Sequence, residues 1–168
     1  MLMISYLGKR ILNYVKPTNN IGYLINHLAS VMSRQADQIL QERLGVGMSQ
    51  FKLLMILKWD KNVQQKFIAT SLGQTEASIS RQIKLLHEQN LLHTTINPKN
   101  RRQHMTTLTA KGERLTEQAF EVLHTYNQPV LSRLSDKQQK QLIEMLSIMH
   151  AEVCTGDKPG ACHHPIGI

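Results

Sequence analysis

The stretch of residues 75–85 carries mostly polar side chains at spacings that would align them along one side of a helix. The set comprises Thr75, Glu76, Ser78, Arg81, Gln82 and Leu85. Hydroxyl, amide and guanidinium groups can hydrogen-bond to base edges when such a helix lies in the DNA major groove. We therefore predict that Arg81 and Gln82, assisted by Thr75 and Ser78, contact bases.

A second group of polar and basic side chains follows in the sequence KNRRQH. It consists of Lys99, Asn100, Arg101 and Arg102, with runs rich in Leu, Thr and Ile on both sides. This pattern predicts two short strands joined by a positively charged turn. Basic side chains on such a hairpin suit the DNA minor groove, so Arg102, with Arg101 and Lys99, is predicted to enter or border it.

Residues 64–109 contain the elements that would position both groups. Two helical patterns are separated by a break at Gly73. In the second pattern, spacings of four and three predict an apolar stripe that faces a core, formed by Ile79, Ile83 and Leu86. A helix-turn-helix followed by a hairpin is a winged helix. The predicted fold class is therefore mainly α, with a small β-hairpin wing.

The same residues resemble a known family. The segments ASISRQIKLLHEQNLL and NPKNRRQHMTTLTAKG are similar to the recognition helix, the wing and the start of the next helix in the MarR family of bacterial transcriptional regulators. The resemblance extends over residues 20–153. It implies a ligand- or stress-responsive repressor that acts as a homodimer, binds a near-palindromic operator in double-stranded DNA and responds to a small-molecule effector or a stress signal.

The sequence departs from the family pattern in the wing and just before it. The family usually carries an acid at the positions of Asn97 and Asn100, and a glycine at the position of Asn90. Asn90 suits a helix end because asparagine tolerates the left-handed conformation. Asn100 would hold Arg102 through a neutral hydrogen bond in place of the family's salt bridge. We therefore expect a wing that is looser and more positive.

Long amphipathic helices are predicted on both sides of the winged helix. The first covers residues 20–44 and places near one face Leu24, Leu28, Val31, Gln35 and Ile39. The last follows a cap at Ser135, and its stripe is Leu142, Met145, Leu146, Met149 and Val153. Few apolar residues remain in the winged helix to cover these stripes. The first and last long helices are therefore predicted to interlock across the two-fold axis of an obligate dimer.

Two further helices are expected between these. One begins after Met48 with Ser49 as its N-cap, and its core candidates are Phe51, Leu54, Met55 and Leu57. Trp59, at its end, would either pack or line a ligand cavity. The other helix follows Thr109, carries an apolar stripe and is predicted to bend at Pro129.

The predicted organisation has five parts: a helical extension at 1–17, a dimerisation helix at 18–47, the winged helix at 48–109, dimerisation helices at 110–153 and a flexible tail at 154–168. The extension has an apolar face and basic residues elsewhere. It suits either a dimer contact or a helix that lies on a membrane surface.

The charge distribution favours a nucleic-acid partner. The chain has 168 residues, is 41% hydrophobic and has a formal net charge of +8. Residues 1–114 carry 16 basic and 6 acidic residues, and the rest carries 4 and 6. The positive charge thus accompanies the predicted winged helix, as expected of a protein that neutralises phosphates. No apolar run is long enough to span a membrane, and the N-terminus is a poor secretory signal, so a cytoplasmic location is predicted.

The tail gathers side chains that could bind a metal. These are His150, Cys154, Cys162, His163 and His164, a set that suits zinc or copper(I). Their spacing matches no closed zinc module, so a solvated tail without a cofactor is favoured, and a redox pair of the two cysteines stays open. No phosphate loop, nucleophile elbow or metalloprotease motif is present, so no enzyme is predicted.

Two alternatives to a sequence-specific regulator are compatible with these residues. A winged helix can serve as a protein-interaction adaptor, and a basic DNA-binding module can act as a non-specific architectural protein. Steep salt dependence of duplex binding would separate DNA binders from the adaptor. In a footprinting experiment, protection of one near-palindrome would indicate the regulator, and uniform protection would indicate the architectural protein.

Overall fold

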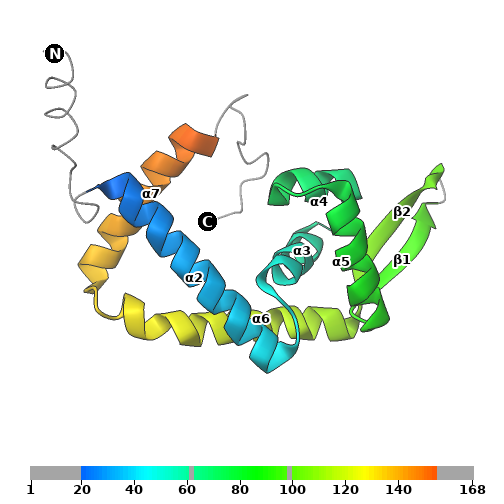
Figure 1. The fold of residues 1–168 in the computed structure, drawn as a ribbon, viewed down its shortest axis with the longest axis horizontal. Coiled ribbons are helices and arrows are strands. Elements are labelled where there is room, and N and C mark those ends of the chain that lie inside the picture. The colour runs from blue at the N-terminus through cyan, green and yellow to red at the C-terminus, as the bar shows by residue number, and fades with distance from the viewer. Residues whose placement is uncertain (1–19, 61–62, 98–99, 155–168) are drawn as a thin grey trace, which may run out of the picture.

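The structure is a computed structural model that describes residues 20–60, 63–97 and 100–154. The predicted extension at 1–17 lies outside these ranges. The described elements are α2 (Ile21–Leu44), α3 (Met48–Trp59), α4 (Gln65–Leu72), α5 (Glu76–Glu88), β1 (Leu92–Asn97), β2 (Asn100–Leu108), α6 (Ala110–Leu131) and α7 (Asp136–Cys154). The mainly helical winged helix-turn-helix predicted from the sequence is confirmed. Figure 1 shows α6 running beneath the molecule, with the hairpin near one end and α7 near the other, while α2 crosses α6 between them.

Side chains at the helix ends define where α2 and α3 begin. Asn20 caps α2, because its side chain accepts from the backbone N–H of Tyr23 at 2.9 Å. The prediction that Ser49 caps α3 is wrong, since α3 begins at Met48 and its cap is Gly47. The Met48 N–H donates to Asp37 Oδ1 at 2.7 Å, and the Gly47 N–H donates to Gln50 Oε1 at 2.9 Å. The side chains of Asp37 and Gln50 thus accept from the backbone N–H groups at the start of α3, in place of the predicted serine cap.

The last two helices begin and end close to the predicted positions. Ser135 caps α7 as predicted: its backbone N–H donates to Gln138 Oε1 at 2.9 Å, and its hydroxyl accepts from the Gln138 N–H at 3.4 Å. Pro129 lies inside the last turn of α6, which ends at Leu131. Among the described residues, no helix combines the length and hydrophobicity that a membrane span requires.

The main core lies inside the winged helix. Its buried members come from α3, α4, α5, the segment before α3 and the segments that follow α3 and α5: Val46, Leu53, Leu54, Leu57, Val63, Ile68, Ala69, Ile79, Ile83, Leu86, Leu91 and Leu92. The inward stripe predicted for α5 is therefore confirmed. Phe51 is also buried as predicted, but it belongs to a smaller cluster with Leu40 of α2 and Ala119 of α6. Met55 is only half-buried.

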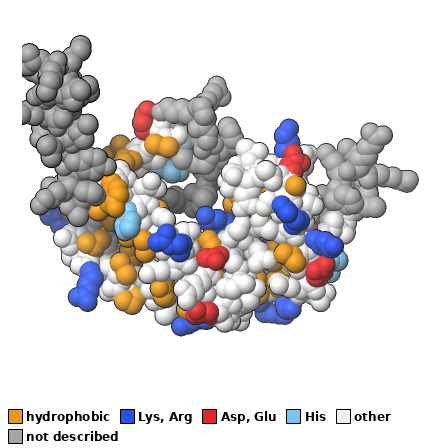
Figure 2. Space-filling view, viewed as in Figure 1, with side chains coloured by type: hydrophobic (Ala, Val, Ile, Leu, Met, Phe, Trp, Pro, Cys, Tyr) orange, Lys and Arg blue, Asp and Glu red, His pale blue; other side chains and the backbone are white. Residues whose placement is uncertain are grey.

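The buried face of α2 differs from the predicted stripe. Its buried residues are Ala36 and Leu40, in the second half of the helix, whereas Leu24 and Leu28 are 44% and 55% exposed. The reason is that α2 meets α3 and α6 through this second half, where Leu40 packs against Phe51. The first half therefore presents apolar side chains to the surface, and Figure 2 shows hydrophobic side chains exposed in this part of the molecule.

The wing is a two-stranded antiparallel hairpin. Its register runs from Leu92 opposite Leu108 to Ile96 opposite His104, and an irregularity then brings Asn97 opposite Asn100. Leu92 is buried in the core of the winged helix. The hairpin is thus anchored at its base, and the far ends of β1 and β2 lie away from the helices (Figure 1).

Candidate nucleic-acid interface

The turn between α4 and α5 sets the direction of the recognition helix α5. Gly73 ends α4 in the left-handed conformation, with φ of 62°, which favours glycine. Thr75 caps α5, because its side chain accepts from the Ser78 N–H at 3.2 Å. The break predicted at Gly73 is confirmed, and it turns the exposed face of α5 outward.

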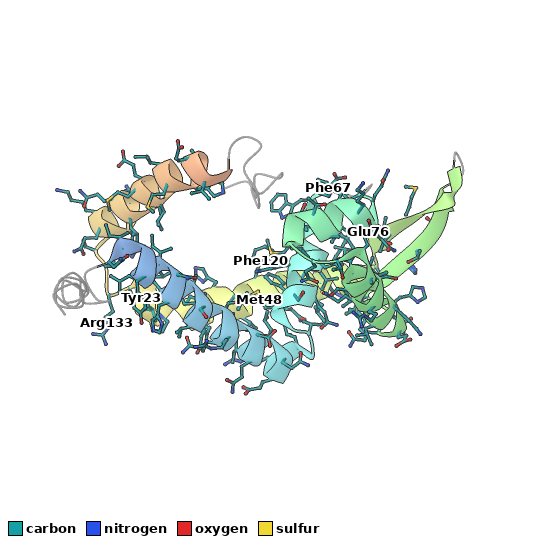
Figure 3. The ribbon with its side chains drawn as sticks, turned by 45° about the horizontal axis from the view of Figure 1, so that its top comes forward. Tyr23, Met48, Phe67, Glu76, Phe120 and Arg133 are labelled. Carbon is teal, nitrogen blue, oxygen red and sulfur yellow. The ribbon has the colours of Figure 1, made fainter. Side chains whose placement is uncertain are left out.

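The exposed face of α5 carries part of the predicted contact set. Thr75, Glu76 and Arg81 are exposed, and Leu85 is 50% exposed. Figure 3 labels Glu76 at the start of this helix, on the side of the molecule that carries the wing. The same face also exposes side chains that the sequence argument did not single out, namely Ala77, Ser80 and Lys84. Their spacing of three and four from one another could have identified them.

Ser78 and Gln82 differ from the other predicted contact residues because they are only half-exposed. Gln74 Oε1 accepts from Ser78 Oγ at 3.1 Å and from Gln82 Nε2 at 2.7 Å. Gln74 Nε2 donates to Ser49 Oγ at 2.6 Å, and Ser49 Oγ donates to Gln82 Oε1 at 3.1 Å. Both side chains are thus held by the turn and by the start of α3.

The other end of α5 is joined to the wing and to α6. Asn90 adopts φ of 59°, as its predicted role at the helix end requires, and the Leu91 N–H donates to Leu86 O at 2.9 Å. Thr109 Oγ1 donates to Asn90 O at 2.8 Å, and Lys111 Nζ donates to Gln89 O at 2.8 Å. The recognition helix is therefore fixed at both ends.

The basic group of the wing lies at the far end of the hairpin. Asn100, Arg101 and Arg102 begin β2, and Asn100 pairs with Asn97 at the end of β1. Lys99 lies outside the described residues. The hairpin predicted around this group is confirmed, whereas the contacts of its side chains with DNA stay a prediction.

Comparisons with known proteins agree with this geometry. Residues 46–104 match the model of the MarR family. The chain is 26% identical over 109 residues to the HTH-type transcriptional regulator BilQ of Clostridium symbiosum, covering 65% of this chain and 74% of that protein. It is 24% identical over 126 residues to the HTH-type transcriptional repressor Rv2887 of Mycobacterium tuberculosis, covering 75% and 90%.

Solved structures share the fold. The repressor CouR bound to a 23-mer DNA duplex superposes with a TM-score of 0.70 at 22% identity, covering 82% of this chain and 97% of that one. CouR from Rhodococcus jostii RHA1 bound to p-coumaroyl-CoA gives a TM-score of 0.65 at 20% identity, covering 79% and 92%. Residues 46–104 thus form a winged helix of the MarR-family type. The chain is a DNA-binding transcriptional regulator, and the family that it matches is not a class of enzymes.

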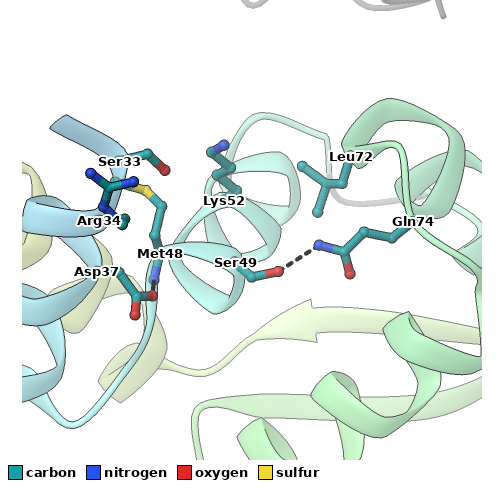
Figure 4. A pocket seen from close by; sticks show the side chains of 8 residues that line it. All are labelled: Ser33, Arg34, Asp37, Met48, Ser49, Lys52, Leu72 and Gln74. Atoms are coloured by element: carbon teal, nitrogen blue, oxygen red, sulfur yellow. Dashed lines mark hydrogen bonds between the residues drawn. The ribbon is translucent and has the colours of Figure 1, made fainter. Parts of the chain in front are cut away.

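A pocket of about 380 Å³ lies beside the recognition module. Its lining comes from α2, α3, the end of α4 and the turn that follows it: Ser33, Arg34, Asp37, Met48, Ser49, Lys52, Leu72 and Gln74. Figure 4 shows the Ser49–Gln74 hydrogen bond on one wall and Asp37 next to Met48 on the other. Trp59 is not part of this lining and is 75% exposed, so it does not pack into the core of the described chain, and its role at a ligand cavity stays a prediction.

The predicted metal-binding residues are only partly described. His150 is exposed on α7, and Cys154 is the last residue of that helix. Cys162, His163 and His164 lie outside the described residues. Within the described part of the chain, no three His, Cys, Asp or Glu side chains form a group that could hold a metal ion. Zinc or copper binding by the tail therefore stays untested.

Proposed function

We propose that this MarR-family regulator is a homodimeric, ligand- or stress-responsive repressor that binds a near-palindromic operator in double-stranded DNA. The observation that carries this proposal is the exposed face of α5, with Arg81 at its centre and a wing beside it. A helix and a hairpin on one side of a module can contact adjacent grooves of a duplex.

The proposed division of contacts follows from exposure. Thr75 and Arg81 would contact base edges, because both side chains are exposed on α5. The wing group Lys99, Asn100, Arg101 and Arg102 would bind along or inside the minor groove. Ser78 and Gln82 belong to the same surface by position, although their side chains are held by Gln74.

The dimer is supported by the apolar surface opposite the wing. Exposed apolar residues of the stripe predicted on α7 include Met145 at 56%, Met149 at 43% and Val153 at 62%. Within the described part of the chain, no other element packs extensively against α7. Large exposed apolar faces mark interaction sites, and a second copy would supply the second recognition helix that a near-palindrome needs.

A small-molecule effector is proposed on the basis of the pocket between α2, α3 and the turn. Arg34 and Lys52 give this pocket two positive side chains, and Asp37 gives it one negative side chain. Ser49 and Gln74, which hold Gln82, also line it. An occupant of this pocket would therefore lie close to residues that position α5.

The test is selection of bound duplexes from a random DNA library, followed by anisotropy titrations of the selected duplex at several salt concentrations. We expect one near-palindromic sequence and an affinity that falls steeply as salt rises. Binding without an enriched sequence would indicate an architectural protein. Failure to bind DNA at low salt would favour the adaptor and contradict the proposal.

A further inference from the structure

Gln74 forms a closed ring of hydrogen bonds with Ser49 and Gln82. Ser49 Oγ donates to Gln82 Oε1, Gln82 Nε2 donates to Gln74 Oε1, and Gln74 Nε2 donates to Ser49 Oγ. Each member is both donor and acceptor, so the ring fixes the orientation of both amides. Rotation of the Gln74 amide would set its N–H groups against those of Gln82. Rings of this kind reinforce their own bonds.

The ring leaves Gln82 poorly suited to contact a base. Bidentate recognition of adenine by glutamine uses one amide N–H and the amide oxygen together. In Gln82 the oxygen accepts from Ser49, while Nε2 donates to Gln74 at 2.7 Å and lies 3.4 Å from Ser78 Oγ. Ser78 Oγ in turn donates to Gln74. Contact with a base would require these half-buried bonds to break.

We propose that Gln74 is a positioning residue for DNA recognition, and that Ser78 and Gln82 act through it rather than by contacting bases. This inference rests on the proposed function, because it assigns roles within the same interface. Base contacts then fall to the exposed residues of α5, above all Arg81, which directly precedes Gln82 in the sequence.

The ring joins α5 to the rest of the molecule through α3. Ser49 lies in the first turn of α3, and the N–H of the neighbouring Met48 donates to Asp37 of α2 at 2.7 Å. The start of the recognition helix is therefore linked through α3 to the long helix α2. Loss of the ring would let this end of α5 shift as a unit, and a shift of about 1 Å is enough to weaken every contact made from the helix.

The experiment uses three variants that open the ring: Gln74→Ala, Gln82→Ala and the double variant that combines these two changes. Arg81→Ala is measured beside them for comparison. The probe is the selected duplex together with a panel of duplexes that each carry one changed base pair. Gln82→Ala and Gln74→Ala should each weaken binding about three- to tenfold. The loss should be the same on every duplex of the panel, so the base preferences stay unchanged. The double variant should bind as weakly as Gln74→Ala alone, because both changes open one ring.

Controls separate positioning from loss of folding. Gln89→Ala removes an exposed glutamine at the far end of the same helix and should bind like the parent protein. Thermal unfolding identifies any variant that fails to fold. If Gln74→Ala fails in this way, Ser49→Ala opens the ring from the α3 side, and it should also weaken binding uniformly across the panel.

Three results would overturn the inference while leaving the proposed function intact. Gln82→Ala could abolish discrimination at one base pair of each half-site, which would make Gln82 a base-contacting residue. The losses of the two single variants could add in the double variant. Folded Gln74→Ala could bind like the parent. Failure of the parent protein to bind any duplex would instead overturn the proposed function, and the positioning role with it.

Discussion

Arg81 presents a guanidinium group on the exposed face of α5, where its fork geometry suits the O6 and N7 atoms of guanine. Replacing Arg81 by Ala should cost roughly 1 to 3 kcal/mol of binding free energy on the selected duplex and less on random DNA. Anisotropy titrations on both duplexes measure the difference. Equal losses on the two duplexes would make Arg81 a phosphate contact.

Arg102 belongs to the start of β2, at the far end of the wing. A positive side chain there interacts with the negative potential of the groove rather than with one base, so Arg102→Ala should weaken binding to all sequences by a similar factor. The slope of log affinity against log salt should also become shallower by about one unit. Parent-like affinity and slope would remove the wing from the interface.

Residue types predicted which face of α5 is exposed better than they predicted the hydrogen bonds that its side chains form within the chain. Thr75 and Arg81 are exposed as the polar pattern indicates, because the apolar spacing alone orients the helix. The ring at Gln82 could not be predicted, since it joins Ser49 to Gln74 and Gln82 across segments far apart in the sequence. The cap of α3 shows the same limit, because Asp37 reaches Met48 from another helix.

At the scale of elements, the junction between the recognition helix and α6 depends on Gly112. An added Cβ at this position would lie 2.1 Å from the Leu91 carbonyl oxygen, which is a backbone atom. Gly112→Ala must therefore move the start of α6 away from the wing, at a cost of about 1 to 3 kcal/mol or more in unfolding free energy. The variant should also bind the selected duplex more weakly, because α5 loses its fixed end.

Gly22→Ala is the matched control for this change. Gly22 lies in the first turn of α2, and its added Cβ would meet Asn20 Oδ1 at 3.4 Å, an ordinary contact. Alanine also favours the helix more than glycine does, so this variant should be at least as stable as the parent. Chemical denaturation compares the two variants. Equal stability of Gly112→Ala and Gly22→Ala would contradict the close approach at Leu91.

Element order and the winged helix followed directly from local patterns, such as the break at Gly73 and the apolar stripe of α5 at spacings of four and three. The burial of α2 did not, because it depends on where α2 crosses its neighbours. Leu40 is buried since it meets Phe51 and Ala119, although it was not in the predicted stripe, whereas Leu24 and Leu28 of that stripe are exposed. Periodicity identifies an apolar face, but the neighbouring helices determine which side and which length of the helix one chain buries.

At the scale of the whole molecule, the apolar face of α7 supports the proposed dimer, and Met145→Glu tests this proposal. Met145 is 56% exposed in the single chain and belongs to the stripe predicted to pack against a second copy. An unpaired carboxylate buried there should weaken dimerisation by at least about 2 kcal/mol, or roughly thirtyfold. Ser147→Glu adds the same charge on another side of α7 and serves as the control. Sedimentation equilibrium should show monomers for Met145→Glu at concentrations where the parent and Ser147→Glu are dimers.

A parent that stays monomeric, or a Met145→Glu variant that dimerises like the parent, would exclude this face of α7 as the dimer contact. Because one recognition helix contacts only one half-site, the monomeric variant should also lose preference for the near-palindrome over an isolated half-site.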